Sequence, residues 1–331
     1  MSASPALTGG FARIRQVPRP LIWLLLLVLG LLLPFLVYPV LAMEMLCFAL
    51  FASAFNLLLG FAGLLSFGHA AFFGLGAYVF GHAAKVWGLD PLLGLLLSLL
   101  AGLALGALFG LVAIRRQGIY FAMVTLALAQ IVFFVLVQAP FTGGEDGLQG
   151  IPRGVALGLI DLQADSVVLG QRAPWALYCV VLAVTLLGHA VIVRLVHSPT
   201  GLALRATQEH EARARSLGLP ATRIKFGVLV LSAGLAGLAG GLKALVLGLA
   251  SLSDAAWNMS GEVVLMTLLG GVGTLFGPPV GAFFLRFLHN ALAGLGSWVT
   301  VVIGVIFVVC VLVFRRGMVG ELQALLDRKR S

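Results

Sequence analysis

Long apolar runs dominate the chain, and polar residues occur mainly between them. Six runs are long enough to cross a bilayer, because a spanning helix needs about 20 apolar residues. They are 21–40, 92–113, 118–138, 175–196, 224–250 and 297–314. Two further apolar regions, 41–84 and 260–293, are too long for one span and are interrupted by glycine. The pattern predicts an all-α polytopic membrane protein.

The two interrupted regions resemble each other. LLGFAGLLSFG (58–68) and LLGGVGTLFG (268–277) align with one gap, and each lies between two predicted spans. The alignment pairs three glycines of each segment: Gly60 with Gly270, Gly63 with Gly273 and Gly68 with Gly277. The sequence therefore predicts an internal repeat of broken membrane segments.

Broken segments in corresponding halves mark the binding site of many secondary transporters, and we apply that rule here by analogy. The alternative is that both are tight turns between packed helices, with glycine chosen for close backbone approach. Both interpretations can hold together. Two glycine series, the G-x-x-x-G series Gly102/Gly106/Gly110 and the similarly spaced Gly234/Gly237/Gly241, are interpreted as packing alone. The candidate pathway residues are Gly60, Gly63, Ser66, Gly68, His69, Gly270, Gly273, Gly277 and Pro278.

Few ionisable residues lie inside the predicted spans, where such groups are functional candidates. His69 has no acidic neighbour in sequence, so we interpret it as a neutral imidazole that hydrogen-bonds a backbone carbonyl freed by the glycine break. Glu44, Glu262 and Arg286 lie near span ends, from which long side chains reach the interface at little cost. They are interpreted as isolated charges.

Charge decides the number of spans. Hydrophobic residues make up 61% of the 331 residues and charged residues only 10%, against about 25% in soluble domains. Counting 41–84 and 260–293 as two spans each gives about ten, with both termini cytoplasmic. This arrangement places most of the 21 basic residues inside, as the positive-inside rule requires. A re-entrant hairpin at 260–293 would give the same sidedness. The net charge of +9 is therefore no sign of nucleic-acid binding.

We expect one transmembrane domain over 1–331. The run 20–43 exceeds the apolar core of a signal peptide, about 7–15 residues, so we expect it to be retained as the first span. The expected regions outside the membrane are a cytoplasmic N-terminal segment (1–20), a periplasmic loop (139–174), a cytoplasmic segment (197–223) and a cytoplasmic tail (315–331).

The cytoplasmic segment carries helix signals at both ends. Ser198 is a suitable N-cap, followed by Pro199 at the first helical position. Gly218 fits the left-handed position after the helix, and Pro220 prevents its continuation. These signals predict one helix over 199–217 that is too polar to cross the membrane. Docking on a cytoplasmic protein is one interpretation, and an amphipathic helix at the lipid surface is the other.

Five stretches together resemble the membrane subunits of ABC importers for branched-chain amino acids, specifically the longer, Liv-type "M" half of the permease pair. They are GLLSFGHAAFFGLGAY (63–78), GIYFAMVTLALAQ (118–130), FTGGEDGLQGIPRG (141–154), the segment 198–245 and GEVVLMTLLGGVGTLFGPPVGAFF (261–284). The resemblance implies an ABC importer permease fold in which 197–223 couples to an ATPase. The match to the broader EAA signature of ABC importers is loose, because its spacing is one residue off and I-x-L-P is missing. The implied coupling residues are Leu204, Arg205, Glu209, Glu211, Arg215 and Gly218.

The resemblance also implies partners. The chain lacks the phosphate-binding motif G-x-x-x-x-G-K-[ST], so ATP and magnesium would be bound by two separate cytoplasmic ATPase subunits and the chain itself would be no enzyme. A second permease subunit, expected to be a paralogue, would complete the pore in the bacterial inner membrane. A periplasmic binding protein would dock on the loop 139–174 near Glu145 and Asp146.

Several functions remain open at this point. The first is import of branched-chain or other hydrophobic amino acids, and related permeases carry urea, short amides or other amino acids. A stand-alone channel for a small neutral solute is a further alternative. A secondary transporter should carry buried carboxylates, which the isolated charges do not suggest. Only an ABC permease explains the capped polar helix.

Overall fold

The computed structural model describes residues 19–156, 158, 160–164, 166–168, 171–313 and 317–321. Most of the predicted N-terminal segment (1–20) and most of the predicted C-terminal tail lie outside these residues. The first half of the described chain contains α2 (Arg19–Leu36), α3 (Pro39–Asn56), α4 (His69–Lys85), α5 (Pro91–Ala113) and α6 (Ile119–Gln138). The second half contains α7 (Trp175–Val196), α8 (Pro199–Glu209), α9 (Glu211–Ser216), α10 (Ala221–Leu247), α11 (Trp257–Gly270), α12 (Gly277–Ala291) and α13 (Val299–Val313).

Five of the described helices are long and apolar enough to cross a membrane. They are α3 together with a π-helical turn (Pro39–Phe61), α5, α6, α7 and α10. The predicted apolar run 260–293 divides into α11 and α12, of 14 and 15 residues. At 1.5 Å per residue each is about 21–23 Å long, less than the roughly 30 Å of a hydrocarbon core. The structure is therefore that of a polytopic membrane protein in which neither α11 nor α12 is long enough to span the hydrocarbon core alone.

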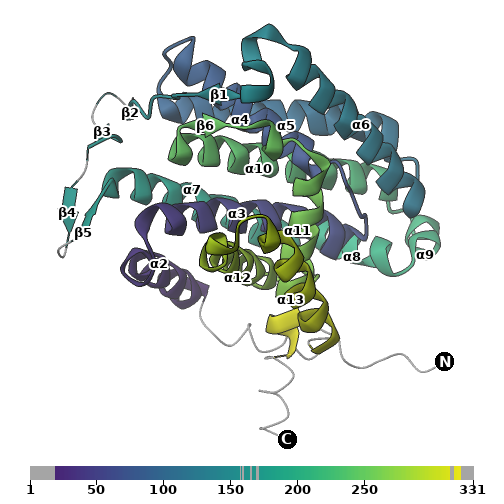
Figure 1. Cartoon of the computed structure of the whole chain (residues 1–331). Helices are drawn as coiled ribbons and strands as arrows, with labels where there is room; N and C mark the ends of the chain where they lie inside the picture. The colour runs from purple at the N-terminus through teal and green to yellow at the C-terminus, as the bar shows by residue number, and fades with distance from the viewer. Residues whose placement is uncertain are drawn as a thin grey trace, which may run out of the picture.

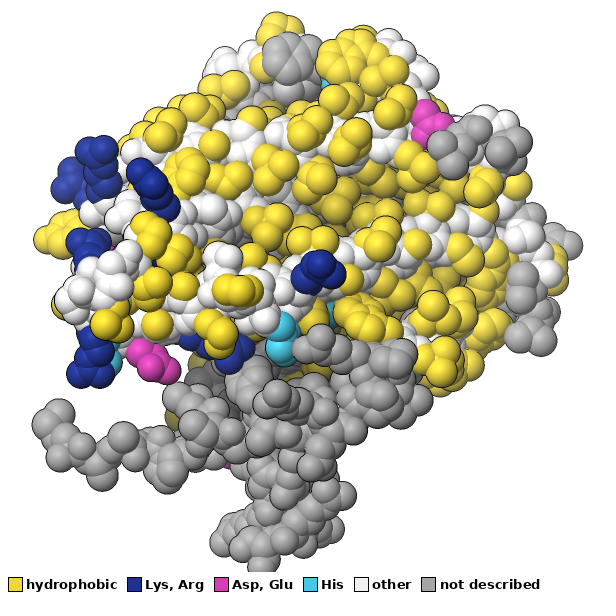
Figure 2. Space-filling model, turned by 180° about the vertical axis from the view of Figure 1, so that it is seen from behind, with side chains coloured by type: hydrophobic (Ala, Val, Ile, Leu, Met, Phe, Trp, Pro, Cys, Tyr) yellow, Lys and Arg dark blue, Asp and Glu magenta, His cyan; other side chains and the backbone are white. Residues whose placement is uncertain are grey.

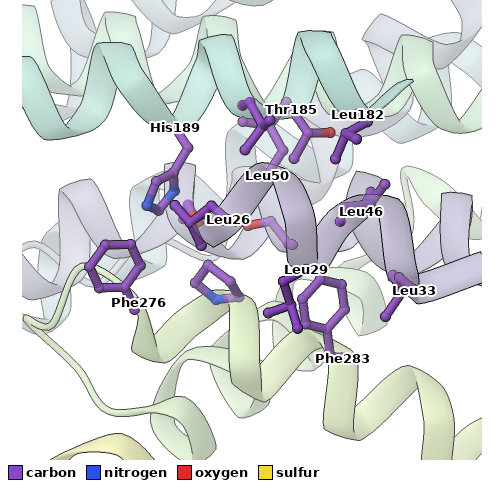
Figure 3. A pocket seen from close by; sticks show the side chains of 15 residues that line it. Leu26, Leu29, Leu33, Leu46, Leu50, Leu182, Thr185, His189, Phe276 and Phe283 are labelled. Atoms are coloured by element: carbon purple, nitrogen blue, oxygen red, sulfur yellow. Dashed lines mark hydrogen bonds between the residues drawn. The ribbon is translucent and has the colours of Figure 1, made fainter. Parts of the chain in front are cut away.

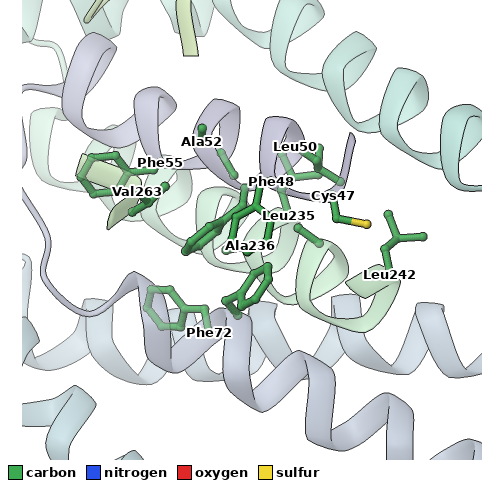
Figure 4. Packing of buried hydrophobic residues seen from close by; sticks show 14 of the residues in the cluster. Cys47, Phe48, Leu50, Ala52, Phe55, Phe72, Leu235, Ala236, Leu242 and Val263 are labelled. Atoms are coloured by element: carbon green, nitrogen blue, oxygen red, sulfur yellow. The ribbon is translucent and has the colours of Figure 1, made fainter. Parts of the chain in front are cut away.

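Most helices run side by side in layers (Figure 1). Helices α4, α5 and α10 pack against one another, and α3 lies between α10 and α12, with α7 on another side. Of the five long apolar helices, α3 and α10 are the most enclosed, because 89% and 83% of the residues in their most apolar stretch are buried. Figure 4 shows side chains of α3, α4, α10 and α11 in this core, among them Phe48, Phe72, Leu235 and Val263. The core therefore surrounds α3 and α10.

Small residues allow α5 and α10 to pack at backbone distance. A Cβ atom added at Gly102 would lie 2.5 Å from the Ala233 carbonyl oxygen. One added at Gly237 would lie 2.7 Å from the Ser98 carbonyl oxygen. Since real Cβ atoms do not approach this closely, only glycine fits at these positions. The interpretation of these two glycine series as packing is confirmed at the contact between α5 and α10.

The segment between α6 and α7 contains short strands that the all-α prediction missed. Strands β2 (Val155–Ala156) and β3 (Ile160–Asp161) pair, as do β4 (Ser166–Val168) and β5 (Gln171–Ala173). Strand β1 (Leu148–Gln149) pairs instead with β6 (Leu249–Ala250), which follows α10. This segment is therefore anchored to the end of α10. We call this end of the bundle the β end; α8 and α9 lie at the opposite end (Figure 1).

The surface matches a membrane setting. In Figure 2 apolar side chains cover most of the visible face, and Lys and Arg gather at the end where α8 and α9 lie. Many large apolar side chains are exposed on α5, α6 and α7, including Leu111, Phe134 and Leu187. Exposed apolar area on this scale is rare on soluble monomers and is expected where helices face lipid.

Candidate functional site

The two predicted breaks lie against each other in the structure. Asn56, at the end of α3, donates a hydrogen bond to the Thr274 carbonyl oxygen at 2.8 Å. Its side-chain oxygen accepts from the Gly273 backbone N–H at 2.9 Å. A Cβ atom on Gly60 would lie 2.5 Å from the Gly273 nitrogen. We call this contact, formed by Asn56, Gly60, Gly273 and Thr274, the break junction.

The sequence repeat is also present in the backbone conformation. The aligned residues Gly63 and Gly273 both have positive φ, +68° and +75°. The helix that follows each break begins at matching positions, with α4 starting one residue after Gly68 and α12 at the aligned Gly277. Only glycine adopts such φ values without a steric cost. The two halves therefore share a helix–break–helix unit.

Side chains satisfy the exposed backbone of the first break. The Ser260 hydroxyl on α11 donates to the Phe67 carbonyl oxygen at 2.7 Å and accepts from the Ala70 N–H at 2.9 Å. The Phe67 N–H donates to the Thr125 hydroxyl at 3.2 Å. The Ser66 hydroxyl accepts from the Gly68 N–H at 3.1 Å. Irregular backbone at membrane depth requires such partners, because no water is available there.

His69 is fully buried, but its partner differs from the prediction. Its Nε2 atom lies 2.9 Å from the Ser232 hydroxyl, which itself donates to the Ala54 carbonyl oxygen at 2.5 Å. Because the serine proton is used on Ala54, Nε2 is the donor to Ser232. The predicted direct bond to a freed carbonyl is therefore wrong, since a hydroxyl on α10 lies between. The neutral, hydrogen-bonding interpretation agrees with this geometry.

The predicted single helix over 199–217 is two helices. The chain turns at His210, with φ −149° and ψ 88°, which separates α8 from α9. Both ends agree with the prediction: the Ser198 hydroxyl accepts from the Gly201 N–H, and Gly218 has φ +82°. The interruption was missed because no proline or glycine marks it.

The predicted coupling residues point in different directions. Leu204 is buried, and the Arg205 guanidinium lies 5.5 Å from the centre of the Phe61 ring, next to the first break. Glu209, Arg215 and Gly218 are exposed. Two apolar side chains that the prediction did not include, Leu202 and Leu217, are 65% and 75% exposed. The outer face of α8–α9 thus combines apolar and charged groups.

Glu211 faces the body of the protein. Its carboxylate lies 2.7 Å from the Lys225 ammonium on α10 and 2.5 Å from the Arg215 guanidinium. It also accepts a hydrogen bond from Gln117, between α5 and α6. Partial burial raises the pKa of Glu211, but the contacts with Lys225 and Arg215 outweigh it, and the net pKa lies below the ordinary value. Glu211 therefore fixes α9 against two neighbouring parts of the chain.

Gln208 connects α8 to the break junction. Its side-chain amide donates to the Gly60 carbonyl oxygen at 3.1 Å. A Cβ atom on Gly63 would lie 3.1 Å from the Gln208 Cγ atom. A continuous series of contacts therefore runs from the polar α8–α9 segment through Gln208 and Gly60 to Asn56 and the second break.

An apolar cavity of about 170 Å³ lies beside the second break, between α2, α3, α7 and α12 (Figure 3). Phe276 and His189 meet at its edge, with ring centres 5.6 Å apart. The His189 Nε2 and Thr185 Oγ1 atoms are buried without a hydrogen-bond partner. Among the described residues that line the cavity there is no Asp, Glu, Lys or Arg, so it suits an apolar group and not a zwitterion.

The charges predicted to be isolated are not isolated. The Arg286 Nη1 atom on α12 lies 3.6 Å from Glu44 on α3 and 3.6 Å from Glu262 on α11. Close by, Lys243 on α10 hydrogen-bonds Asp254 in a buried ion pair. In the described part of the chain, no group of three or more His, Cys, Asp and Glu side chains is placed to hold a metal ion.

Comparison with known proteins identifies the family of this chain. The family described as "Branched-chain amino acid transport system / permease component" matches residues 40–311. This chain belongs to that family. The match includes both breaks, α8–α9 and the loop between α6 and α7. No solved structure matches the chain.

Two relatives are both described as "High-affinity branched-chain amino acid transport system permease protein LivM". The chain is 34% identical to the one from Salmonella typhimurium over 235 residues and 30% identical to the one from Escherichia coli over 294 residues. These alignments cover 67% and 83% of this chain. They span 55% and 68% of the two relatives, which extend beyond the matched part. The chain is thus similar to permease components over most of its length.

The two acidic residues predicted to dock a binding protein lie in the loop between α6 and α7. Glu145 and Asp146 lie in a 3-10 turn (Gly144–Asp146) and are both exposed at the β end of the permease. Sequence reasoning found these residues and the glycines but missed Asn56, Gln208 and Ser260. Asn56 and Ser260 are polar residues in or beside apolar runs, and that was the available signal, whereas Gln208 lies in the polar segment and nothing in the sequence distinguishes it from its neighbours.

Proposed function

We propose that this chain is a permease subunit of an ATP-driven ABC importer and that it translocates branched-chain and other hydrophobic amino acids. The observation that carries the proposal is the contact series from α8–α9 through Gln208 to the break junction, in a chain of this permease family. A channel for a neutral solute would need no polar, capped element attached to its broken segments.

The mechanism that we propose is mechanical coupling. ATP and magnesium bind to the partner ATPase subunits, and this chain supplies no catalytic residue. Movement of α8–α9 pulls on Gly60 through Gln208, and Gly60 is packed against Gly273. Because Asn56 holds both breaks together, they shift as a unit and not one by one. Such a shift would alternate access to the pathway.

We further propose ten membrane helices with both termini cytoplasmic in the bacterial inner membrane. In this arrangement α8–α9 is cytoplasmic and the β end is periplasmic, as the clustering of Lys and Arg near α8–α9 favours (Figure 2). Helices α11 and α12 lead into the second break and back from it. A second permease subunit, which we expect to be a paralogue, completes the pore.

Two docking surfaces complete the proposal. The ATPase would contact the outer face of α8–α9, where Leu202 and Leu217 offer apolar area beside Glu209 and Arg215. The periplasmic binding protein would contact the loop at Glu145 and Asp146. In this assembly the binding protein selects the substrate, so few polar groups are needed along the pathway.

The test is uptake by the complete transporter in proteoliposomes, with the cognate ATPases, second permease and binding protein. We expect uptake of leucine, isoleucine and valine that stops without ATP. Uptake of urea or short amides in preference to amino acids would replace the proposed substrate class. Uptake that continues without the ATPase subunits would contradict the importer assignment.

A further inference from the structure

We propose that Glu44, Glu262 and Arg286 form a site for the ammonium group of the amino acid in transit, which we call the carboxylate pair site. This inference rests on the proposed function and names the residues that contact the substrate's positive charge. The three side chains come from α3, α11 and α12. These helices also supply or flank both breaks.

The charges of the site do not balance. Two carboxylates face one guanidinium, and both ion-pair distances end on the same atom, Arg286 Nη1. Two carboxylates sharing one cation leave a formal charge of −1 in apolar surroundings. An uncompensated charge inside a membrane protein is costly unless a counter-charge is available. The site therefore favours an additional cation.

The geometry leaves the carboxylates open to a ligand. Each Arg286 contact is 3.6 Å long, beyond hydrogen-bond length. The Glu262 Oε1 and Arg286 Nε atoms are buried and have no hydrogen-bond partner. An ammonium group carries three donors, so it can bond both carboxylates at once.

The two carboxylate side chains of the site are partly exposed. The side chains of Glu44 and Glu262 are 22% and 20% exposed, while the guanidinium is held over the Phe48 ring at 3.4 Å from its centre. Each carboxylate lies five residues from the start of its helix, about 8 Å along the axis.

A second ion pair nearby has balanced charges. Lys243 and Asp254 are matched one to one, hydrogen-bonded to each other and almost fully buried. The ammonium of Lys243 lies 6.0 Å from the centre of the same Phe48 ring. This pair has no excess charge, although its Asp254 Oδ2 atom is also buried without a hydrogen-bond partner. It provides a matched control for the loss of charge in this region.

His289 is the competing cation within the chain. Its Nδ1 atom lies 3.7 Å from Glu262, and protonation would neutralise the site without a substrate. Its Nδ1 atom is buried without a hydrogen-bond partner, although the side chain as a whole is 41% exposed. We assign the cation to the substrate, and the variant His289→Gln tests that assignment.

The binding test is protection from chemical labelling in the full chain, purified and placed in nanodiscs. A hydrophobic carbodiimide modifies carboxyl groups in apolar surroundings, and mass spectrometry reports labelling at Glu44 and Glu262. We expect millimolar leucine and leucinamide, which carry an ammonium group, to lower labelling at least threefold. The analogue 4-methylpentanoate, which lacks that group, should not protect. Equal labelling throughout, or equal protection by the analogue, would overturn the proposal.

The transport test uses the reconstituted transporter. We expect Glu44→Gln and Glu262→Gln to reduce leucine uptake at least tenfold, as loss of a charged hydrogen bond implies. Glu262→Asp should recover part of the uptake, because the negative charge remains. The paired control Lys243→Gln with Asp254→Asn should retain uptake and protection, as should His289→Gln, and loss of protection in His289→Gln would contradict the proposal.

The outcomes separate this inference from the proposed function. Wild-type uptake of leucine, with unchanged uptake in both Gln variants, would reject the carboxylate pair site and leave the importer assignment standing. Failure of the wild-type transporter to import any amino acid would reject the importer assignment first.

Discussion

Asn56 is more important to the break junction than any glycine of the repeat. Its amide group bonds the second break at two backbone atoms, Gly273 N and Thr274 O. Both atoms lie in an interrupted segment where other backbone partners are scarce. Replacing the amide removes both bonds at once and leaves a donor and an acceptor unsatisfied.

We predict that Asn56→Ala lowers the free energy of unfolding by about 1–3 kcal/mol, the typical cost of leaving buried polar groups unpaired. Uptake should fall even where the protein is fully assembled. Thermal unfolding in detergent and uptake per assembled complex measure the two effects. The control is Ser53→Ala, one turn earlier, because Ser53 bonds only the Ala49 carbonyl of its own helix. Equal behaviour of the two variants would argue against the junction.

Glu211 is predicted to position α9. Glu211→Lys should abolish uptake without preventing membrane insertion, because it places a positive charge beside Lys225 and Arg215. Adding Lys225→Glu recreates the pair with reversed charges and should restore part of the uptake. Failure of the double variant to recover, with normal insertion, would mean that Glu211 acts outside this ion pair.

The same contacts predict a dependence on pH. The pKa of Glu211 is lower in the folded chain than its ordinary value of 4.5. Its stabilisation is therefore complete at neutral pH and is lost as pH falls through the lowered value. Hydrogen exchange in α9, corrected for intrinsic rates, should rise roughly two- to fivefold below that pH, as expected for exposed ion pairs. Glu211→Gln should show the faster exchange at pH 7 and little further change.

At the scale of elements, sequence patterns located most helices closely. The apolar runs 92–113, 118–138 and 175–196 match α5, α6 and α7 to within a residue, because length and hydropathy determine a spanning helix. The repeat could also be predicted from the sequence, because a backbone position with positive φ favours glycine. The break junction could not be predicted, because it joins residues that are 217 and 218 positions apart in the chain. The carboxylate pair site was missed for the same reason: each charge looked isolated along the chain.

The breaks lead to a prediction on backbone conformation. Gly63→Ala forces a side chain into the left-handed region, at a cost of roughly 1–2 kcal/mol, and pushes against Gln208. We expect uptake to fall while the ATPase subunits still bind, as measured by co-purification. Gly273→Ala, at the aligned position, should behave similarly. Gly227→Ala on α10 is the control, because an added Cβ there meets nothing within 4 Å. If both break variants simply fail to fold, the glycines serve packing alone.

At the scale of the whole molecule, the two ends of the bundle have different chemistry. The β end holds paired strands and exposed acidic residues. The opposite end holds α8–α9, with mixed charge and exposed leucines. Between them, α3 and α10 form a buried centre that touches both. This arrangement suits a machine in which substrate enters at one end and force is applied at the other.

The central claim is that α8–α9 drives the breaks through Gln208, and uptake per ATP hydrolysed by the reconstituted transporter tests it most directly. For Gln208→Ala we predict continued ATP hydrolysis with roughly two- to tenfold less leucine imported per ATP, as loss of one hydrogen bond implies. An unchanged ratio of uptake to hydrolysis in this variant would contradict the account.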